Sequence, residues 1–302
     1  MASVPGRPVV FGEVLFDRFE DGTRVLGGAP FNVAWHLAGF GLDPLFISRV
    51  GRDELGEQVL TAMTGWGLDV GGLQRDASHP TGSVHVSLSK GQPDFRILPD
   101  QAYDYIDADA VRTSLAGLTP ALLYHGSLVA RNRVSRKALE QLRATGVPAF
   151  VDINLRAPWW QRKGLDTLVH GARWLKLSET ELAVLMDAGA LDPGQLESTT
   201  RMVRERYGCA LLVVTQGEHG GWFATRDAAG RIEPVAVPEF ADAVGAGDAF
   251  SSVTLLGLVH GWPLPKTLRR AAAFAARICT IRGATTSHRA LYDEMLTQWE
   301  SD

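Results

Sequence analysis

Asp248 follows a glycine-rich turn, and this pairing is the feature of the sequence that most clearly predicts chemistry. Gly245, Ala246 and Gly247 carry little or no side chain, so their backbone N–H groups can approach an anion, and the helix expected next adds its positive dipole end. A carboxylate there would repel the anion, unless it takes a proton from an attacking hydroxyl group. The pattern predicts phosphoryl transfer to an alcohol. The alternative is that the glycines serve packing and Asp248 only favours the first helical turn.

The composition is typical of a soluble enzyme. The chain has 302 residues, 45% of them hydrophobic, and a formal charge of −4, with no basic block interleaved with aromatic residues, so we expect no nucleic-acid partner. No targeting segment and no apolar run of the roughly 18 residues needed to span a bilayer is visible, so no membrane association is expected. Cys209 and Cys279 lack a CxxC partner, which indicates buried thiols and a reducing, cytoplasmic location.

Short apolar runs alternate with amphipathic stretches, which predicts an α/β fold with a doubly wound, mostly parallel sheet and helices on both faces. We expect one domain over residues 1–302. Strands are expected at 8–14, 44–49, 121–124, 148–152, 173–177 and 210–215. Helices are expected at 30–40, 53–66, 134–145, 178–187, 195–207, 245–260 and 265–281.

Two segments, about 17–27 and 81–105, break this rhythm. Residues 83–89 alternate apolar with polar side chains and precede a turn at 90–91, so they predict half-exposed antiparallel strands. Such inserted strands could form a lid over a cleft. Their apolar side chains need cover on the face that the core does not protect, which predicts a homodimer through the lid; these side chains are Val84, Val86, Leu88, Phe95 and Ile97.

Four polar residues stand at or just past expected strand ends: Asp17, Asn154, Ser178 and Thr215. Ligands of doubly wound folds gather outside the carboxyl ends of the strands, so these side chains should face one crevice. Alternatively, each caps the next helix or turn. For Ser178 and Glu181 this alternative stays open, because their spacing fits a capping box.

Several catalytic patterns are missing from the sequence. There is no GxxxxGK[ST] loop, no HEXXH and no GxSxG, and the eight histidines lack a spacing suited to a transition metal. The segment His125-Gly126-Ser127 lacks the second glycine of a nucleophile elbow, so we interpret it as a polar strand end. A kinase interpretation therefore depends on the glycine-rich turn.

The sequence resembles the ribokinase-like (PfkB) family of sugar and nucleoside kinases over nearly its whole length. Its GGAPFNVA at 27–34 and DAVGAGD at 242–248 resemble the N-terminal and C-terminal signatures of that family, in the family's order and separation. Further segments resemble family landmarks: VGRDELG at 50–56, PTG at 80–82, DINLR at 152–156, LSETE at 177–181 and VTQGE at 214–218.

The resemblance implies roles for individual residues. Asp248 would be the general base, with the 245–248 backbone as anion hole. Asp17 and Asn32, beside the Gly27 and Gly28 backbone, would bind sugar hydroxyl groups. Arg156 would add a cation near the phosphates, unless it is a surface arginine. The ATP side would be formed by Asn154, Ser178, Thr215, Gly217, Gly220 and Gly247.

The resemblance also implies metal ions. Mg²⁺ would arrive with ATP and would be organised by Glu181 through water. A monovalent cation, K⁺, could sit behind the anion hole, near the Asp242 carboxylate, the Val244 carbonyl, Gly283 and Ser287. Asp242 could instead only cap the glycine turn.

Residues 28–32 and 152–160 look more like fructokinases and 2-keto-3-deoxygluconate kinases than like ribokinase or adenosine kinase. We expect fructose as the substrate and keep 2-keto-3-deoxygluconate as the alternative. A nucleoside kinase would need an aromatic sandwich, which Tyr103 or Tyr105 could supply. A sugar-binding regulatory module on the same fold is the alternative that is not an enzyme. Ser178 stands where many relatives have Asn, and Gln216 occupies a position that is often apolar.

Overall fold

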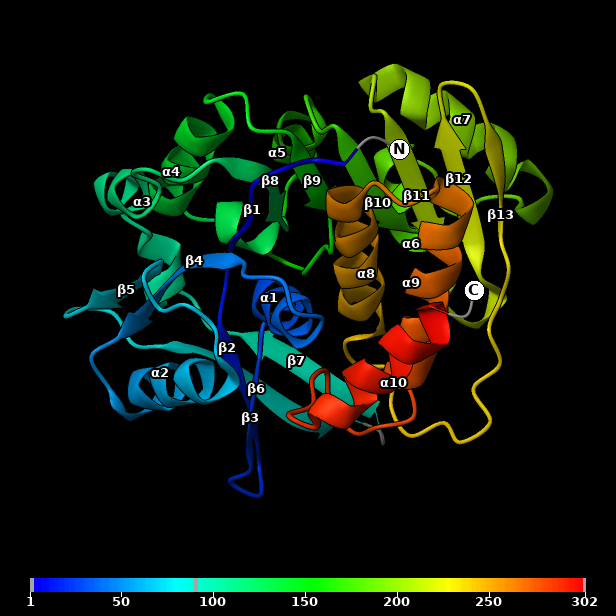
Figure 1. Ribbon diagram of the computed structural model, residues 1–302. Coiled ribbons are helices and arrows are strands. Elements are labelled where there is room, and N and C mark those ends of the chain that lie inside the picture. The colour runs from blue at the N-terminus through cyan, green and yellow to red at the C-terminus, as the bar shows by residue number, and fades with distance from the viewer. Residues whose placement is uncertain (1–2, 90–91, 301–302) are drawn as a thin grey trace.

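The computed structural model describes residues 3–89 and 92–300, and a nine-stranded sheet forms its centre (Figure 1). The strands stand in the order β13-β12-β11-β10-β9-β8-β1-β4-β5. From β11 to β5 all neighbours pair in parallel, and β12 and β13 add an antiparallel edge. The bounds are β1 (Arg7–Phe11), β4 (Leu45–Gly51), β5 (Leu73–Asp76), β8 (Pro120–His125), β9 (Ala149–Asp152), β10 (Trp174–Ser178), β11 (Leu211–Thr215), β12 (Gly221–Thr225) and β13 (Ala229–Ile232).

The six predicted strands all lie in this sheet, but the first ends earlier than expected. It was expected over 8–14 and ends at Phe11, because the chain then turns toward a second sheet. A Cβ on Gly12 would lie 2.3 Å from Pro30 Cγ, so the turning backbone passes directly against the start of the next helix. The predictions missed β5, β12 and β13, which are only four or five residues long.

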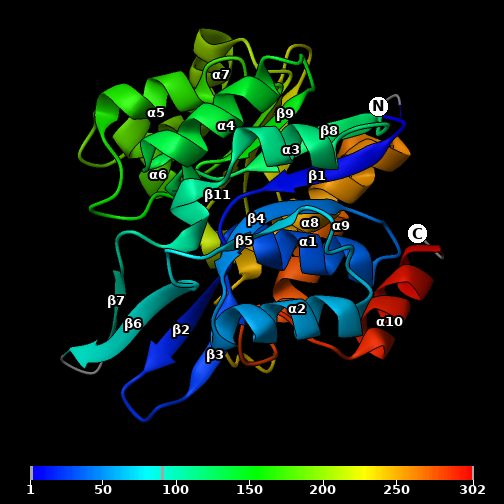
Figure 2. The same ribbon diagram turned by 90° about the vertical axis from the view of Figure 1, so that its left-hand side faces the viewer.

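Helices cover both faces of the sheet, as predicted (Figure 2). One face packs against α1 (Ala29–Gly39), α2 (Glu54–Trp66), α8 (Ala246–His260), α9 (Leu264–Ile278) and α10 (Arg289–Glu300). The other face packs against α3 (Ala108–Ser114), α4 (Arg133–Arg143), α5 (Arg162–Val169), α6 (Glu179–Leu185) and α7 (Leu196–Tyr207). Successive strand residues point to opposite faces of the sheet. Val10 packs in the core on the α8 side and Val9 in the core on the α4 side.

Short 3₁₀ turns complete the fold at η1 (Ala102–Tyr105), η2 (Leu128–Ala130), η3 (Pro193–Gln195) and η4 (Gly217–His219). The seven predicted helices are all present, whereas α3, α5 and α10 were not predicted. Of these, α3 does carry a start signal that the predictions overlooked, because Asp107 caps its first turn.

The inserted segments form a separate four-stranded sheet in the order β3-β2-β6-β7, with β2 (Leu15–Phe19), β3 (Arg24–Gly27), β6 (Gly82–Ser89) and β7 (Gln92–Ile97). Figure 2 shows it projecting from the main body. The small sheet is confirmed, and β6 and β7 pair antiparallel, as residues 83–98 predict. β2 and β3 also pair antiparallel, whereas β2 and β6 pair in parallel. Both strands leave the core from the same side, so they run in one direction.

The apolar residues of this sheet are largely covered by the chain itself. Val84, Val86 and Ile97 are buried together with Tyr103 and Leu128. Phe95 is 47% exposed. The side chain of Leu88 and the turn expected at 90–91 lie outside the described residues. Three of these side chains are therefore covered within the chain itself, which leaves Phe95 as the exposed one among those described.

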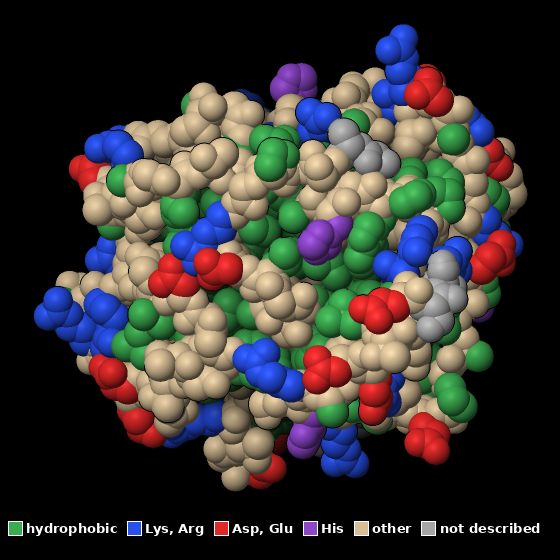
Figure 3. Space-filling model, viewed as in Figure 1, with side chains coloured by type: hydrophobic (Ala, Val, Ile, Leu, Met, Phe, Trp, Pro, Cys, Tyr) green, Lys and Arg blue, Asp and Glu red, His purple; other side chains and the backbone are tan. Residues whose placement is uncertain are grey.

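On the face drawn in Figure 3, side chains of both charges are interspersed over the surface. Among the described residues, no helix combines the length and the apolar character that a membrane crossing requires. Cys209 is buried as expected, but Cys279 is only half-buried, because it lies at the end of α9. Both thiols are free.

Candidate active site

The glycine-rich turn lies at the start of α8, as the sequence predicts. Gly245 has a φ of 79°, in the left-handed region, and precedes the first helical residue, Ala246. A Cβ on Gly245 would lie 2.5 Å from Ala284 Cα, so this position needs glycine for both its conformation and its packing. The turn leaves the first N–H groups of a 15-residue helix without a side-chain cap, which is the arrangement that favours an anion.

Asp248 in the first turn of α8 is joined to α1 by a hydrogen bond. Asn32 Nδ2 donates to Asp248 Oδ2 at 2.8 Å. Asn32 is held in turn by its backbone N–H, which donates to the Gly28 carbonyl at 2.8 Å. Gly28 has a φ of 110°, and a Cβ there would lie 2.7 Å from the Glu13 carbonyl oxygen. The two segments that resemble family signatures therefore meet at the predicted base.

Burial raises the pKa of Asp248 to about 6. The hydrogen bond from Asn32 opposes this rise, the nearby Asp152 carboxylate adds to it, and Lys176 and Arg156 also oppose it. An aspartate with such a pKa is ionised at neutral pH and is more basic than a solvated one. This is the electrostatic state that a general base needs.

Two further carboxyl groups share this environment. Burial raises the pKa of Asp17 to about 6 and that of Glu13 to about 7. The positive charge of Arg156 lowers the pKa of both groups and of Asp248. Asp17 itself lies within β2, not at an end of the main sheet, because the chain has left that sheet at Phe11.

A cavity of about 450 Å³ opens at the carboxyl ends of β9, β10 and β11. Of the four strand-end residues, Asn154, Ser178 and Thr215 line it and Asp17 does not. Arg156, Glu181 and Gly247 also line it, and so do Asp152 and Lys176. The predicted crevice is therefore present and adjoins the glycine turn.

Lys176 is a functional candidate that the sequence analysis missed. It is 5% exposed, and its Nζ atom lies 2.8 Å from Asp152 Oδ2. Burial alone would lower the pKa of Lys176, but the Asp152 carboxylate raises it on balance, so the ammonium group stays charged. A Cβ built on Gly247 would lie 3.4 Å from Lys176 Nζ, which places this buried cation beneath the glycine turn. The sequence signal that could have identified Lys176 is the presence of a lysine within an otherwise apolar strand.

The Asp152 carboxylate that holds Lys176 is itself fixed by α8. Ser251 Oγ donates to Asp152 Oδ2 at 2.7 Å, and Tyr124 Oη lies 3.4 Å from the same oxygen. Asp152, Lys176 and Ser251 are all buried. The Lys176 ammonium group is therefore held by a buried network of hydrogen bonds.

Glu181 connects two strand ends. Its Oε2 accepts from the Ser178 N–H at 2.7 Å, and the Ser178 Oγ accepts from the Glu181 N–H at 3.2 Å, so the capping box is formed. The other carboxylate oxygen, Oε1, accepts from the Leu155 N–H at 2.6 Å. The capping reading holds, and the same residue lines the cavity.

Asn154 and Arg156 follow β9 in a constrained loop. Asn154 has a φ of 44°, a left-handed conformation that is uncommon for residues other than glycine. Arg156 is exposed, and its Nη1 atom donates to the carbonyl of the preceding residue, Leu155, at 3.1 Å. The Arg156 charge therefore lowers the pKa of the surrounding carboxyl groups without an ion pair to any one of them in the described part of the chain.

The predicted cation site is only partly assembled. Asp242 Oδ1 accepts from the Val244 N–H at 3.0 Å, and Oδ2 accepts from the Gly283 N–H at 3.2 Å. These bonds match the alternative that Asp242 caps the turn. Ser287 is exposed, and within the described part of the chain no hydrogen bond joins it to Asp242. Across the same residues, no group of three or more His, Cys, Asp or Glu is placed to hold a metal.

Gly217 and Gly220 do not line the cavity and instead shape the η4 turn. A Cβ on Gly220 would lie 2.1 Å from the Ile232 carbonyl oxygen, so this glycine permits close packing on the end of β13. Their assignment to the nucleotide side therefore has no support from the cavity. His125 is buried, with its pKa lowered to about 3 by burial, as suits a polar strand end.

Comparisons with known proteins give matches over most of the chain. A family model described as pfkB family carbohydrate kinase matches residues 9–291. The chain is 32% identical to a fructokinase from Klebsiella pneumoniae, with 93% of this chain and 96% of that protein covered. A fructokinase with bound ATP from Xylella fastidiosa has a similar fold, with a TM-score of 0.81, 23% identity, and 98% of this chain and 99% of that chain covered. A double mutant of fructokinase from Vibrio cholerae O395, in a form with bound fructose, ADP and potassium ion, matches with a TM-score of 0.76, 26% identity, and 97% and 99% of the two chains covered.

Proposed function

This chain belongs to the pfkB family of carbohydrate kinases, and from that premise we propose that it transfers the γ-phosphoryl group of ATP to a hydroxyl group of fructose. The observation that carries the proposal is the hydrogen bond between Asn32 and Asp248 beside the glycine turn. It joins the expected sugar side of the site to the expected base and anion hole. Fructose is favoured because the similar proteins named above are fructokinases.

In the proposed reaction, Asp248 accepts the proton of the sugar hydroxyl group as its oxygen attacks the γ-phosphorus. The bond between that phosphorus and the bridging oxygen breaks, and ADP leaves. The N–H groups of residues 245–248 and the Lys176 ammonium group supply positive charge where negative charge develops. Arg156 adds an exposed cation at the rim of the cavity.

On the sugar side, Asn32 and Asp17 are proposed to bind hydroxyl groups, with the Gly27 and Gly28 backbone beside them. The Asn32 Oδ1 atom is buried and has no hydrogen-bond partner within the described residues. A Cβ on Gly27 would lie 4.0 Å from that same atom. A sugar hydroxyl group would satisfy this acceptor.

Magnesium fits the site through Glu181. Each Glu181 carboxylate oxygen accepts one N–H and keeps a second lone pair, so contact through water suits it better than direct ligation. When bound with ATP, Mg²⁺ would supply charge neutralisation for the triphosphate. A potassium ion near Asp242 and the Val244 carbonyl remains part of the proposal.

We also propose a homodimer through the small sheet, in the cytoplasm. Phe19 and Phe95, 40% and 47% exposed, lie on that sheet and would gain cover from a second subunit. The two thiols, which are free, suit a reducing compartment.

The structure disfavours the nucleoside alternative. Tyr103 is fully buried and has Arg131 over its ring at 5.0 Å, while Tyr105 stacks on His79 at a ring distance of 3.6 Å. Tyr103 is therefore not free to sandwich a base, and Tyr105 already has one ring face occupied. The kinship with fructokinases likewise does not favour 2-keto-3-deoxygluconate.

The testing experiment is ADP release with Mg-ATP and K⁺ against fructose, 2-keto-3-deoxygluconate, ribose and adenosine. The proposal expects the highest kcat/KM for fructose. A higher kcat/KM for another compound would contradict the assignment of fructose as the substrate. ATP binding without ADP release for any of them would support the alternative of a sugar-binding regulatory module.

A further inference from the structure

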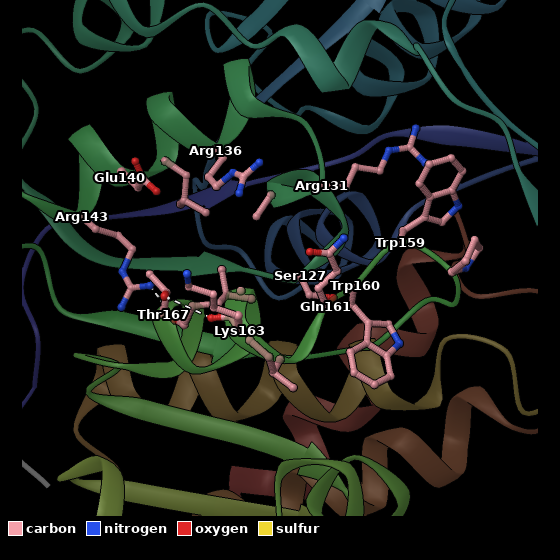
Figure 4. A pocket seen from close by; sticks show the side chains of 16 residues that line it. Ser127, Arg131, Arg136, Glu140, Arg143, Trp159, Trp160, Gln161, Lys163 and Thr167 are labelled. Atoms are coloured by element: carbon pink, nitrogen blue, oxygen red, sulfur yellow. Dashed lines mark hydrogen bonds between the residues drawn. The ribbon is translucent and has the colours of Figure 1, made fainter. Parts of the chain in front are cut away.

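A second cavity, of about 490 Å³, lies between α4 and α5 (Figure 4). Its volume is in the range of small-molecule sites, so it is too small for a folded partner and large enough for a metabolite. None of the residues assigned above to the sugar, the base or the anion hole lines it.

The lining of this cavity is strongly basic. Four cations contribute to it, Arg131, Arg136, Arg143 and Lys163, against one acidic residue, Glu140. Arg143 is engaged with the Leu168 and His170 carbonyl groups at the end of α5. For Arg136 and Lys163, no side-chain hydrogen bond or ion pair is found within the described residues. Two cations are therefore available to a ligand.

Arg131 borders the cavity, but its guanidinium is already bound to the Asp104 carboxylate through Nε and Nη2. The charge that is open to a ligand therefore comes from Arg136 and Lys163. In addition, α5 begins after Gln161 without a side-chain cap, and Gln161 lines the cavity. An uncapped helix N-terminus beside cations is suited to a phosphate group.

Aromatic side chains form one wall. Trp159 and Trp160 both line the cavity, and both are half-buried. Figure 4 shows Trp159 beside Arg131, whose guanidinium lies 4.3 Å from the indole centroid. Indole faces can cover a sugar or base ring while the cations hold an attached phosphate.

This cavity is connected to the active site through one short segment. Trp160 lines both cavities. The Trp159 N–H donates to the Arg156 carbonyl at 2.8 Å, so the indoles and the active-site arginine belong to one hydrogen-bonded turn. We propose that the cavity between α4 and α5 binds a small organic phosphate and that residues 156–160 couple its occupancy to the nucleotide side of the active site.

The binding test uses calorimetric titration of fructose 6-phosphate, AMP and inorganic phosphate into the full chain with its active site saturated by ADP and fructose. At least one organic phosphate is expected to bind. The double variant Arg136→Gln/Lys163→Gln should bind it at least about tenfold more weakly, because two charge-assisted contacts are lost. Lys137→Gln, an exposed neighbour on α4 outside the cavity lining, is the matched control and should not change binding.

The three probes show which kind of phosphate compound the cavity prefers. Preference for fructose 6-phosphate identifies a sugar phosphate, and preference for AMP identifies a nucleotide. The site would be overturned if no probe binds, if inorganic phosphate binds as tightly as both organic phosphates, or if the double variant binds like the control.

Coupling between the two cavities is measured separately. The Kd of ADP is determined with and without a saturating concentration of the organic phosphate. A change of at least about threefold is expected, and the same factor must appear in the reverse titration. An unchanged Kd of ADP would overturn the coupling. Both titrations are equilibrium measurements, so neither depends on turnover.

Discussion

Asn32 and Asp248 stand 216 residues apart in the sequence and are joined by a hydrogen bond of 2.8 Å. The bond fixes the orientation of the carboxylate, and it lowers the pKa of Asp248 against the effect of burial. The same amide keeps its oxygen unpartnered and buried. One side chain can therefore orient the base and bind the sugar at the same time.

The pH dependence of kcat/KM should report Asp248. Below a pH of about 6 the carboxyl group is protonated and cannot accept the hydroxyl proton, so kcat/KM should fall about tenfold per pH unit. Asn32→Ala removes an interaction that lowers this pKa, so the acid limb should move to higher pH. Rate profiles from pH 4.5 to 8 check this. Because Glu13 and Asp17 titrate in the same window, Glu13→Gln serves as control and should retain the limb. Loss of the limb in Glu13→Gln would assign it to Glu13 instead.

Two alanine substitutions should separate the fold from the chemistry of the glycine turn. Gly245→Ala forces a Cβ to 2.5 Å from Ala284 Cα at a φ of 79°, so it should lower the free energy of unfolding by about 1–3 kcal/mol. Gly247→Ala places a Cβ 3.4 Å from Lys176 Nζ, an ordinary contact, so it should change stability little and yet slow phosphoryl transfer. Urea unfolding and kcat are the measurements. Equal stability losses in the two variants would contradict this account.

Lys176→Met should destabilise the protein strongly. It would leave the Asp152 carboxylate buried and without its cation, at a cost of about 3–5 kcal/mol. Adding Asp152→Asn removes that unpaired charge, so the double variant should recover part of the stability. It should not recover kcat, because the positive charge beneath Gly247 is still missing. Recovery of both quantities would reduce Lys176 to a structural role.

Much of this arrangement follows from the sequence. The alternation of apolar and amphipathic runs predicts the parallel sheet, and the GAGD motif predicts a turn that needs glycine at Gly245. The family resemblance is confirmed by the match over residues 9–291. These features are local or depend on motifs, so one sequence is enough to find them.

Other parts depend on tertiary contacts. Lys176 lies between leucines in a strand that looks like ordinary core, and only the sheet order brings it to Asp152 and Gly247. The end of β1 at Phe11 depends on the approach of Gly12 to Pro30, which no local pattern encodes. The close approach of Gly220 to the Ile232 carbonyl group is likewise not encoded by a local pattern.

Glu181→Gln should impair both the loop and the use of magnesium. An amide can accept only one of the two backbone N–H groups and turns a donor toward the other, which costs about 1–3 kcal/mol. The Mg²⁺ concentration needed for half-maximal rate should also rise. Glu179→Gln is the control on the same helix, since the Glu179 carboxylate accepts from the Gln216 side chain. An unchanged Mg²⁺ requirement in Glu181→Gln would remove this residue from the proposed metal site.

The central claim, that Asp248 is the base of a sugar kinase, is tested most directly by Asp248→Asn with fructose and Mg-ATP. ADP release should fall by roughly two to four orders of magnitude. The Kd of fructose and the free energy of unfolding should stay close to those of the unchanged protein, because the amide has nearly the same shape. A rate within about tenfold of the unchanged enzyme would contradict the claim, since positioning alone would then account for catalysis.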